Sequence, residues 1–175
     1  MFARVAAYSI LAALSLRTTV QAPRFTLGTT GAIILSVAGA EARYWVESSE
    51  VYGKPVITVS IGATGARGAL TLSIAGNRLP APGRYAIIQS VAGEGADRGF
   101  SASFAAGSAE HPLGWFHGES GHVTITESDA GHVVGEFEIR ARGFTSSAME
   151  NENQWVTVRG TFRAEGDVTV ARVSN

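Results

Sequence analysis

The residues best suited to carry chemistry are the histidines, which all fall within one short stretch of the chain. They are His111, His117, His122 and His132. Imidazole and carboxylate groups are common ligands of divalent metals, so His117, Glu119 and His122 are the best candidates for a metal site. Alternation along a strand would place His117 and Glu119 on one face and His122 on the other. We therefore expect these side chains to bind no metal unless a bulge brings them together.

Other catalytic motifs are missing or incomplete. Ser120 is followed directly by Gly121, so the Gly-x-Ser-x-Gly elbow of hydrolases is not formed. The glycine-rich stretches 62–68 and 93–99 lack the lysine and hydroxyl residue that end a phosphate-binding loop, and we expect them to be turns. The chain has no cysteine, which excludes thiolate ligands, cysteine nucleophiles and disulfides. These patterns favour a protein that is not an enzyme, with no catalytic residue, no metal and no cofactor.

The elements that must position these residues are strands. Stretches that alternate apolar and polar residues, as half-buried antiparallel strands do, recur near the C-terminus: Gly121–Thr126, Val133–Arg142, Trp155–Ala164 and Val168–Val173. Glycine and proline turns separate the earlier candidates: Ala32–Ala38, Ala42–Val46, Val56–Ile61, Ala69–Ile74, Tyr85–Val91 and Gly99–Phe104. The sequence predicts an all-β fold, an antiparallel β-sandwich or flattened barrel of about ten strands. We expect one domain over residues 31–175, a linker over 23–30 and an apolar N-terminal segment over 1–22.

Two of these stretches, Val133–Arg142 and Trp155–Ala164, show the clearest division into faces. Phe137 and Phe162 fall on the apolar face of their strands, whereas the charged residues fall on the other face. If the two strands pair, Glu136 and Glu138 meet Arg159 and Arg163 across a solvated surface. Gly135 and Gly160 each precede an inward phenylalanine by two residues, which leaves room for an aromatic ring over the backbone. The polar stretch Gly143–Gln154 is expected to be the loop between the strands.

The N-terminal segment Met1–Ala22 has the outline of a secretory signal peptide, with Arg4 followed by an apolar run. As a helix, the run Val5–Leu16 extends about 18 Å, short of the roughly 30 Å hydrocarbon core of a bilayer. Pro23 would directly follow the most plausible cleavage point. Two alternatives remain open, a removed signal and an uncleaved anchor that contacts lipid or partner helices. The candidate anchoring residues are Val5, Ile10, Leu11, Leu14 and Leu16.

The charge balance bears on possible partners. Lysine and arginine together number 14 against 15 aspartate and glutamate residues, and the formal net charge is −1. Such a chain has no overall field to recruit nucleic acid. We expect protein partners and membrane contact, with no nucleic acid bound.

Adjacent aromatic residues suggest a contact surface. In a strand, one member of each of the pairs Tyr44-Trp45 and Trp115-Phe116 must face away from the core unless both faces are covered. Trp155 is out of phase with the apolar positions of its strand. We therefore take Tyr44, Trp45, Trp115, Phe116 and Trp155 as the candidate interaction residues.

The strand sequences resemble those of a group of known domains. The stretches Ser120–Thr126, Val134–Ala141 and Val156–Phe162 are similar to a pattern in uncharacterised exported bacterial β-sandwich domains, which are often lipoproteins. The stretch Leu79–Tyr85 is similar to a strand start in the same proteins. The resemblance implies a β-sandwich and brings no catalytic residue. This chain lacks the cysteine to which a lipoprotein attaches its lipid.

The sequence therefore favours a non-catalytic structural or interaction subunit on the periplasmic side of a bacterial membrane. It would be held in the cell envelope by its N-terminus, as an accessory component of a respiratory, secretion or photosynthetic complex. An exported small-ligand carrier is the alternative, and it would enclose an apolar cavity. A metal-dependent enzyme is the least favoured function.

Overall fold

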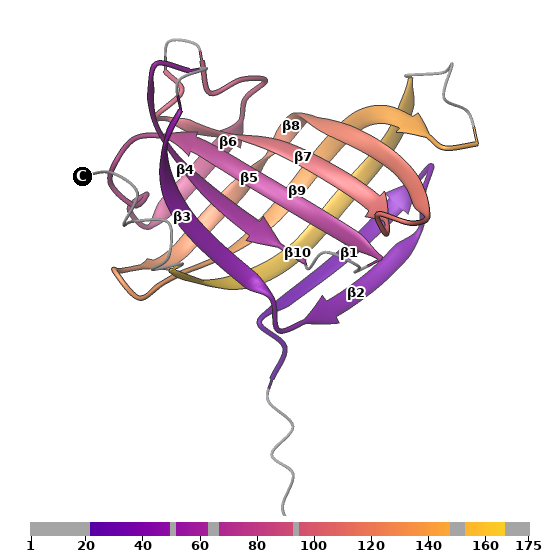
Figure 1. The fold of residues 1–175 in the computed structure, drawn as a ribbon, viewed down its shortest axis with the longest axis horizontal. Helices are drawn as coiled ribbons and strands as arrows, with labels where there is room; N and C mark the ends of the chain where they lie inside the picture. The colour runs from indigo at the N-terminus through magenta and orange to yellow at the C-terminus, as the bar shows by residue number, and fades with distance from the viewer. Residues whose placement is uncertain (1–21, 50–51, 63–66, 93–94, 148–152, 167–175) are drawn as a thin grey trace, which may run out of the picture.

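The computed structural model describes residues 22–49, 52–62, 67–92, 95–147 and 153–166, and within these ranges the chain forms strands and no helix. The ten strands belong to one mostly antiparallel sheet that curls into a flattened, barrel-like ring (Figure 1). No helix in the described part of the chain is long and apolar enough to cross a membrane. The strands are β1 (Phe25–Gly31), β2 (Leu35–Gly39), β3 (Ala42–Ser49), β4 (Lys54–Ile61), β5 (Gly68–Ala75), β6 (Gly83–Ile87), β7 (Gly99–Gly107), β8 (Pro112–Ser128), β9 (His132–Thr145) and β10 (Gln154–Gly166).

The ring closes through β10. One edge of β10 pairs with β9 along nearly its whole length, and β9, β8, β7, β5, β4 and β3 follow in turn around the ring. The other edge of β10 is shared between two strands. β1 pairs with residues 156–162, and among the described residues of β10, Glu165 and Gly166 pair in parallel with β3. In the described part of the chain, a parallel contact at the end of β10 closes the ring.

A single apolar cluster fills the ring. Strand alternation points one set of side chains inward from every wall, and Phe100, Phe104 and Phe116 are almost completely buried among them. The rings of Phe104 and Phe116 stack with their centroids 6.2 Å apart. Ile33 and Leu35, which are partly buried, pack against the same cluster. Aromatic and branched side chains thus occupy the space between the walls.

Two glycines allow the walls to approach each other closely. In the ladder between β9 and β10, Gly160 lies opposite Phe137, and Gly135 lies opposite Phe162. A Cβ on Gly160 would lie 1.9 Å from the Thr26 carbonyl oxygen and 2.8 Å from the Phe137 ring. A Cβ on Gly135 would lie 3.0 Å from the Phe162 ring. The expectation that these glycines leave room for aromatic rings is confirmed, and each ring covers the glycine of the neighbouring strand.

The antiparallel pairing of β9 with β10 is also confirmed, over Gln154–Glu165 and His132–Gly143. Of the expected charge pairs, Arg159 Nη2 lies 3.0 Å from Glu138 Oε1. Arg163 lies instead 3.7 Å from Glu127, because the register places Val134, not Glu136, opposite it.

Several strand boundaries differ from the sequence-based prediction, most of all at β1 and β8. The expected linker over residues 23–30 is largely strand, because β1 begins at Phe25. The third inward residue of β1 is the polar Thr29, so the sequence of β1 does not show a regular alternation of apolar and polar residues. The Thr29 hydroxyl donates a hydrogen bond to the Ile33 carbonyl oxygen. β8 begins at Pro112, well before Gly121, where the predicted strand begins. The predicted strand Val168–Val173 lies outside the described residues.

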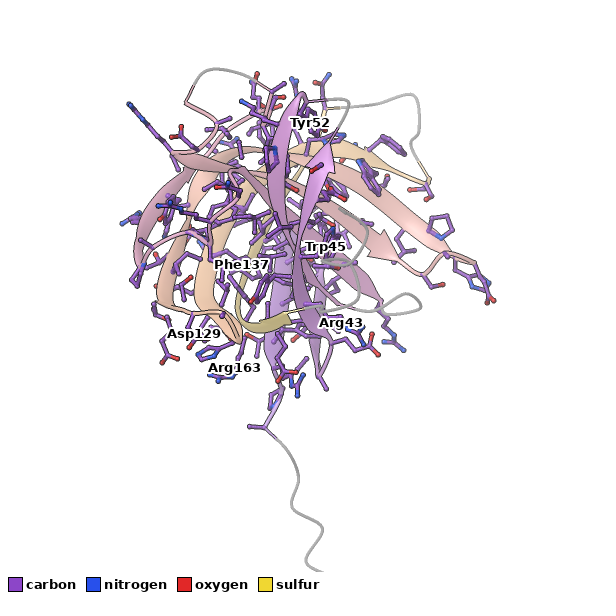
Figure 2. The ribbon with its side chains drawn as sticks, turned by 60° about the vertical axis from the view of Figure 1, so that its left-hand side comes forward. Arg43, Trp45, Tyr52, Asp129, Phe137 and Arg163 are labelled. Atoms are coloured by element: carbon purple, nitrogen blue, oxygen red, sulfur yellow. The ribbon has the colours of Figure 1, made fainter. Side chains whose placement is uncertain are left out.

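The seam of the ring is held by the turn between β8 and β9. The Tyr44 hydroxyl donates to the Ala130 carbonyl oxygen at 2.8 Å, and the Gly166 N–H donates to the Gly131 carbonyl oxygen at 3.3 Å. Burial, followed by the charge of Asp129, raises the pKa of Tyr44, which keeps the hydroxyl protonated as a donor. In Figure 2, Asp129 and Arg163 lie near the same lower edge as Arg43 at the start of β3.

The close approach at Gly160 gives a direct test of the fold. We expect Gly160→Ala to lower the free energy of unfolding by about 1–3 kcal/mol, because the added methyl group must displace backbone of β1. Urea unfolding followed by circular dichroism measures the change. Gly28→Ala is the matched control, since a Cβ at Gly28 meets nothing nearer than 3.9 Å. Equal effects of the two substitutions would contradict this account of ring closure.

Candidate interaction surface

All three tryptophans of the chain point away from the core. Trp115 and Trp155 expose 43% and 37% of their surface, and Trp45 is partly exposed. The expectation that Tyr44 and Phe116 also contribute to a contact surface is wrong, because both are buried in the core. Neighbouring residues in a strand face opposite sides, so the inward Tyr44, Phe116 and Val156 leave Trp45, Trp115 and Trp155 on the outer side.

Trp115 and Trp155 lie at the same end of the ring. Across β9, Trp115 is opposite Phe144, and Trp155 is opposite Arg142. The two tryptophans are therefore separated by one strand, which corresponds to about 10 Å between their backbones. Both project from the outer face of the sheet.

The turn between β1 and β2 reaches the same end of the ring. The Ala32 N–H donates to the Trp155 carbonyl oxygen at 2.9 Å, and the Ile33 side chain extends to the backbone of Gly114 on β8. Ile34 on this turn is 83% exposed, and Leu113 at the start of β8 is 51% exposed. We call this set the tryptophan patch: Ile34, Leu113, Trp115, Phe144 and Trp155.

Polar neighbours fix the orientation of the two indole rings. The Arg140 guanidinium carbon lies over the Trp155 ring, 4.2 Å from its centroid. The Trp115 indole N–H donates to His117 Nε2 at 3.0 Å. Arg142, between the two tryptophans, is held by Glu119 at 3.2 Å. The patch is thus an apolar surface with preset side chains and two arginines beside it.

Trp45 stands apart from this patch. It lies on the outer side of β3, between Tyr52 and Arg43 in Figure 2, and its indole nitrogen donates to Glu47 at 3.3 Å. The described pairing of β3 with β10 lies at the end of β10 opposite Trp155, so Trp45 belongs to a different surface.

The expected division of the metal candidates between two faces is wrong. β8 has a bulge between Gly118 and Ser120, which shifts the alternation. As a result, His117 lies opposite Arg142 and His122 lies opposite Glu138, both on the outer face. The candidates nevertheless have separate partners, because Glu119 pairs with Arg142 and His122 Nδ1 contacts Arg84 at 3.2 Å. In the described ranges, no group of three histidine, aspartate or glutamate residues is placed to hold a metal ion.

Two surface pockets lie away from the tryptophan patch. The larger, about 420 Å³, is formed by the start of β4, the end of β5 and the turn at 95–97. The smaller, about 180 Å³, lies at the seam and is lined by Arg24, Arg43 and Glu165 among others. Strand ends and turns line both pockets, and none of the core phenylalanines does.

Sequence reasoning missed three members of the patch. Phe144 fell in the expected loop, yet β9 continues to Thr145 with Ala141 and Gly143 as its inward residues. Because Gly143 has no apolar side chain, the alternation of apolar and polar residues cannot be recognised at this inward position. The outward residues Arg140, Arg142 and Phe144 nevertheless keep the spacing of two. Ile34 lies on the turn between β1 and β2 and Leu113 at the start of β8, and only the strand pairing brings these two places to the same end of the ring.

Comparisons with protein-family models, with curated proteins and with solved structures find no match to this chain. The argument about function therefore depends on the geometry and chemistry of the surfaces described above.

The turn at the seam predicts a specific response to acid. Backbone N–H groups of Gly131 and His132 donate to Asp129, at 2.7 and 2.9 Å from Oδ1, and lower the pKa of its carboxyl group, helped by the charges of His132 and Arg163. A lowered pKa stabilises the fold above the ordinary value near 3.8, and this contribution is lost as the pH falls through the folded-state pKa.

We expect Asp129→Asn to be less stable than the parent at pH 7 and equally stable once the pH is below both pKa values. Thermal unfolding across the pH range measures the difference. A difference that stays constant from pH 7 into strong acid would show that the charge of Asp129 contributes nothing.

Proposed function

We propose that this chain is a non-catalytic interaction subunit that binds a protein partner through the tryptophan patch, on the periplasmic side of a bacterial membrane. The observation that carries the proposal is the outward placement of Trp115 and Trp155 in a patch with fixed side chains. It would serve as an accessory component of a larger membrane assembly, of the respiratory, secretion or photosynthetic kind.

The energetics of the patch support protein binding. Tryptophan and arginine are the residues most enriched where a few side chains supply most of the binding energy. Arg140 and His117 hold the two indole rings in place before a partner arrives, which reduces the entropy lost on binding. Ile34 and Leu113 add apolar area whose exposure to water is unfavourable in free energy. A partner that covers the patch would remove that cost.

The interactions of the polar side chains support a non-catalytic role. The three metal candidates pair individually, His117 with Trp115, Glu119 with Arg142 and His122 with Arg84. His132 lies instead 3.1 Å from both Glu127 and Asp129. No hydrolase elbow or phosphate-binding loop is present in the sequence. The ring interior is occupied by phenylalanine and branched side chains, which favours this role over a small-ligand carrier.

The proposed location depends on the N-terminal sequence. The apolar run Val5–Leu16 would direct export and could remain as the membrane contact. It is followed by β1, which starts at Phe25 and ends at the turn that carries Ile34. At about 3.3 Å per residue, the length of β1 separates the attachment point from the patch by about 20 Å. An anchored chain would thus present the patch away from its attachment.

Site-specific cross-linking tests the patch. We expect a photo-reactive benzoylphenylalanine at Leu113 to link the chain to one defined protein in the cells that produce it. The same residue at Thr126, exposed at the other end of β8, should give no such product.

Replacing Trp115 and Trp155 together by serine should abolish the link from Leu113, since tryptophans of this kind each contribute about 2 kcal/mol or more. Trp45→Ser is the matched control, because it makes the same substitution on another surface. Undiminished cross-linking in the double variant, with its circular dichroism unchanged, would contradict the proposed interface.

The N-terminal segment gives a separate prediction about location. If residues 1–22 form a retained anchor, the protein isolated from membranes should keep Met1, as intact mass measures. Replacing residues 1–22 by another export signal that is removed should leave a folded, soluble protein that no longer sediments with membranes. A mature chain that starts near residue 23 and runs alone on a sizing column would defeat the membrane-assembly proposal.

A further inference from the structure

A hydrogen bond between Trp115 and His117 fixes one ring of the tryptophan patch. The two residues are two positions apart on β8, so their side chains lie on the same outer face. The Trp115 indole N–H donates to His117 Nε2 at 3.0 Å, and the two ring centroids lie 6.0 Å apart with the ring planes inclined by 65°. The N–H edge of the indole, which is its positive edge, therefore points at the imidazole nitrogen.

This hydrogen bond requires a neutral imidazole. The indole N–H of tryptophan can only donate, whereas a neutral imidazole has one acceptor nitrogen and one donor nitrogen. Because Nε2 is the acceptor, the proton of neutral His117 is on Nδ1. In the imidazolium both nitrogens carry protons, so turning the ring over supplies no acceptor. Protonation of His117 therefore breaks the bond and sets two N–H groups against each other.

Charged groups face His117 from two strands. On β9, Arg142 lies directly opposite, and its Nε is 3.2 Å from the carboxylate of Glu119, two residues further along β8. Arg140, the next outward residue of β9, adds a further positive charge to this face. On β7, the residue opposite His117 is Ser103, which has no charge. An imidazolium here would add positive charge beside Arg142 and compete with it for Glu119.

A proton can reach His117 without any opening of the fold. Histidine is the side chain that ordinarily changes charge between pH 5 and 8. His117 and Trp115 are both exposed, while Phe116 between them is completely buried in the core. The buried phenylalanine holds this part of β8 in place. A change in the charge of His117 therefore acts on the outer side chains and not on the strand.

We propose that His117 controls, through its charge, whether the Trp115 ring is fixed, and that this makes binding at the tryptophan patch sensitive to pH. The inference rests on the proposed function, because it concerns the regulation of that same patch. Neutral His117 holds the indole ring ready for a partner, and protonated His117 releases it. A released ring loses its freedom again when a partner binds, which weakens binding by about two- to tenfold. The partner would be held near neutral pH and released on acidification.

Nuclear magnetic resonance tests the hydrogen bond without any partner. We expect the Trp115 indole N–H resonance to move with pH along the same titration curve as the His117 ring protons, and the Trp155 indole resonance to respond much less. In His117→Gln, the side-chain carbonyl can accept the indole N–H at any pH, so the Trp115 resonance should stay constant between about pH 8 and pH 5. His122→Gln is the matched control, since it removes another histidine of the same face and should leave the Trp115 response unchanged.

Cross-linking from Leu113 at two pH values tests the consequence for binding. In a lysate of the producing cells, the product formed by benzoylphenylalanine at Leu113 should fall at least about threefold between about pH 8 and pH 5. The yield should stay constant in His117→Gln. As a control, His111→Gln removes the histidine nearest to Leu113 in the sequence and should leave the fall unchanged.

The two measurements separate this proposal from the proposed function. A Trp115 resonance that does not follow the titration of His117 would overturn the proposal. An equal loss of cross-linking in the parent and in His117→Gln would also overturn it. A resonance that follows the titration, with no cross-linked product at any pH, would confirm that His117 controls the ring and would contradict the proposed function.

Discussion

The reciprocal contact between glycine and phenylalanine on β9 and β10 is the constraint on which the rest of the structure depends. Phe137 covers Gly160 and Phe162 covers Gly135, and the rings of the two phenylalanines lie 6.4 Å apart. A side chain in place of either glycine would push the strands or rings apart. Because the glycines allow this close approach, β10 can pair with β9 on one edge and with β1 and β3 on the other. The closed ring follows from that arrangement.

Closure of the ring determines which side chains of each strand face the solvent. Once the phenylalanines point inward, the residues next to them in sequence must point outward, and Phe116 therefore determines the exposure of Trp115. The bulge in β8 changes this phase only after Gly118, which brings His117 and His122 to the same outer face. The same inward packing that stabilises the ring thus creates an exposed aromatic surface at one of its ends.

This arrangement bears on the kinds of function that the fold can support. A ring filled with aromatic side chains has little room for a ligand, whereas an outer face with oriented indole rings suits contact with a large partner. The histidines that first suggest metal chemistry are engaged singly, His117 by Trp115 and His122 by Arg84. These residues serve to orient the surface. The proposed binding role rests on this distribution of side chains.

The sequence by itself determined the all-β class, most of the strands and the pairing of β9 with β10, because alternation of apolar and polar residues is a local property of each strand. It did not determine which aromatic of an adjacent pair faces outward, since that choice depends on the phase in the closed ring. The tertiary structure alone decided that β1 is a strand, because the inward Thr29 hydroxyl finds its hydrogen-bond partners, the Ile33 carbonyl oxygen and the Leu35 N–H, in and after the turn that follows. It also decided the membership of the tryptophan patch, since ladders between strands that are distant in sequence bring Ile34, Leu113 and Phe144 to the same end of the ring.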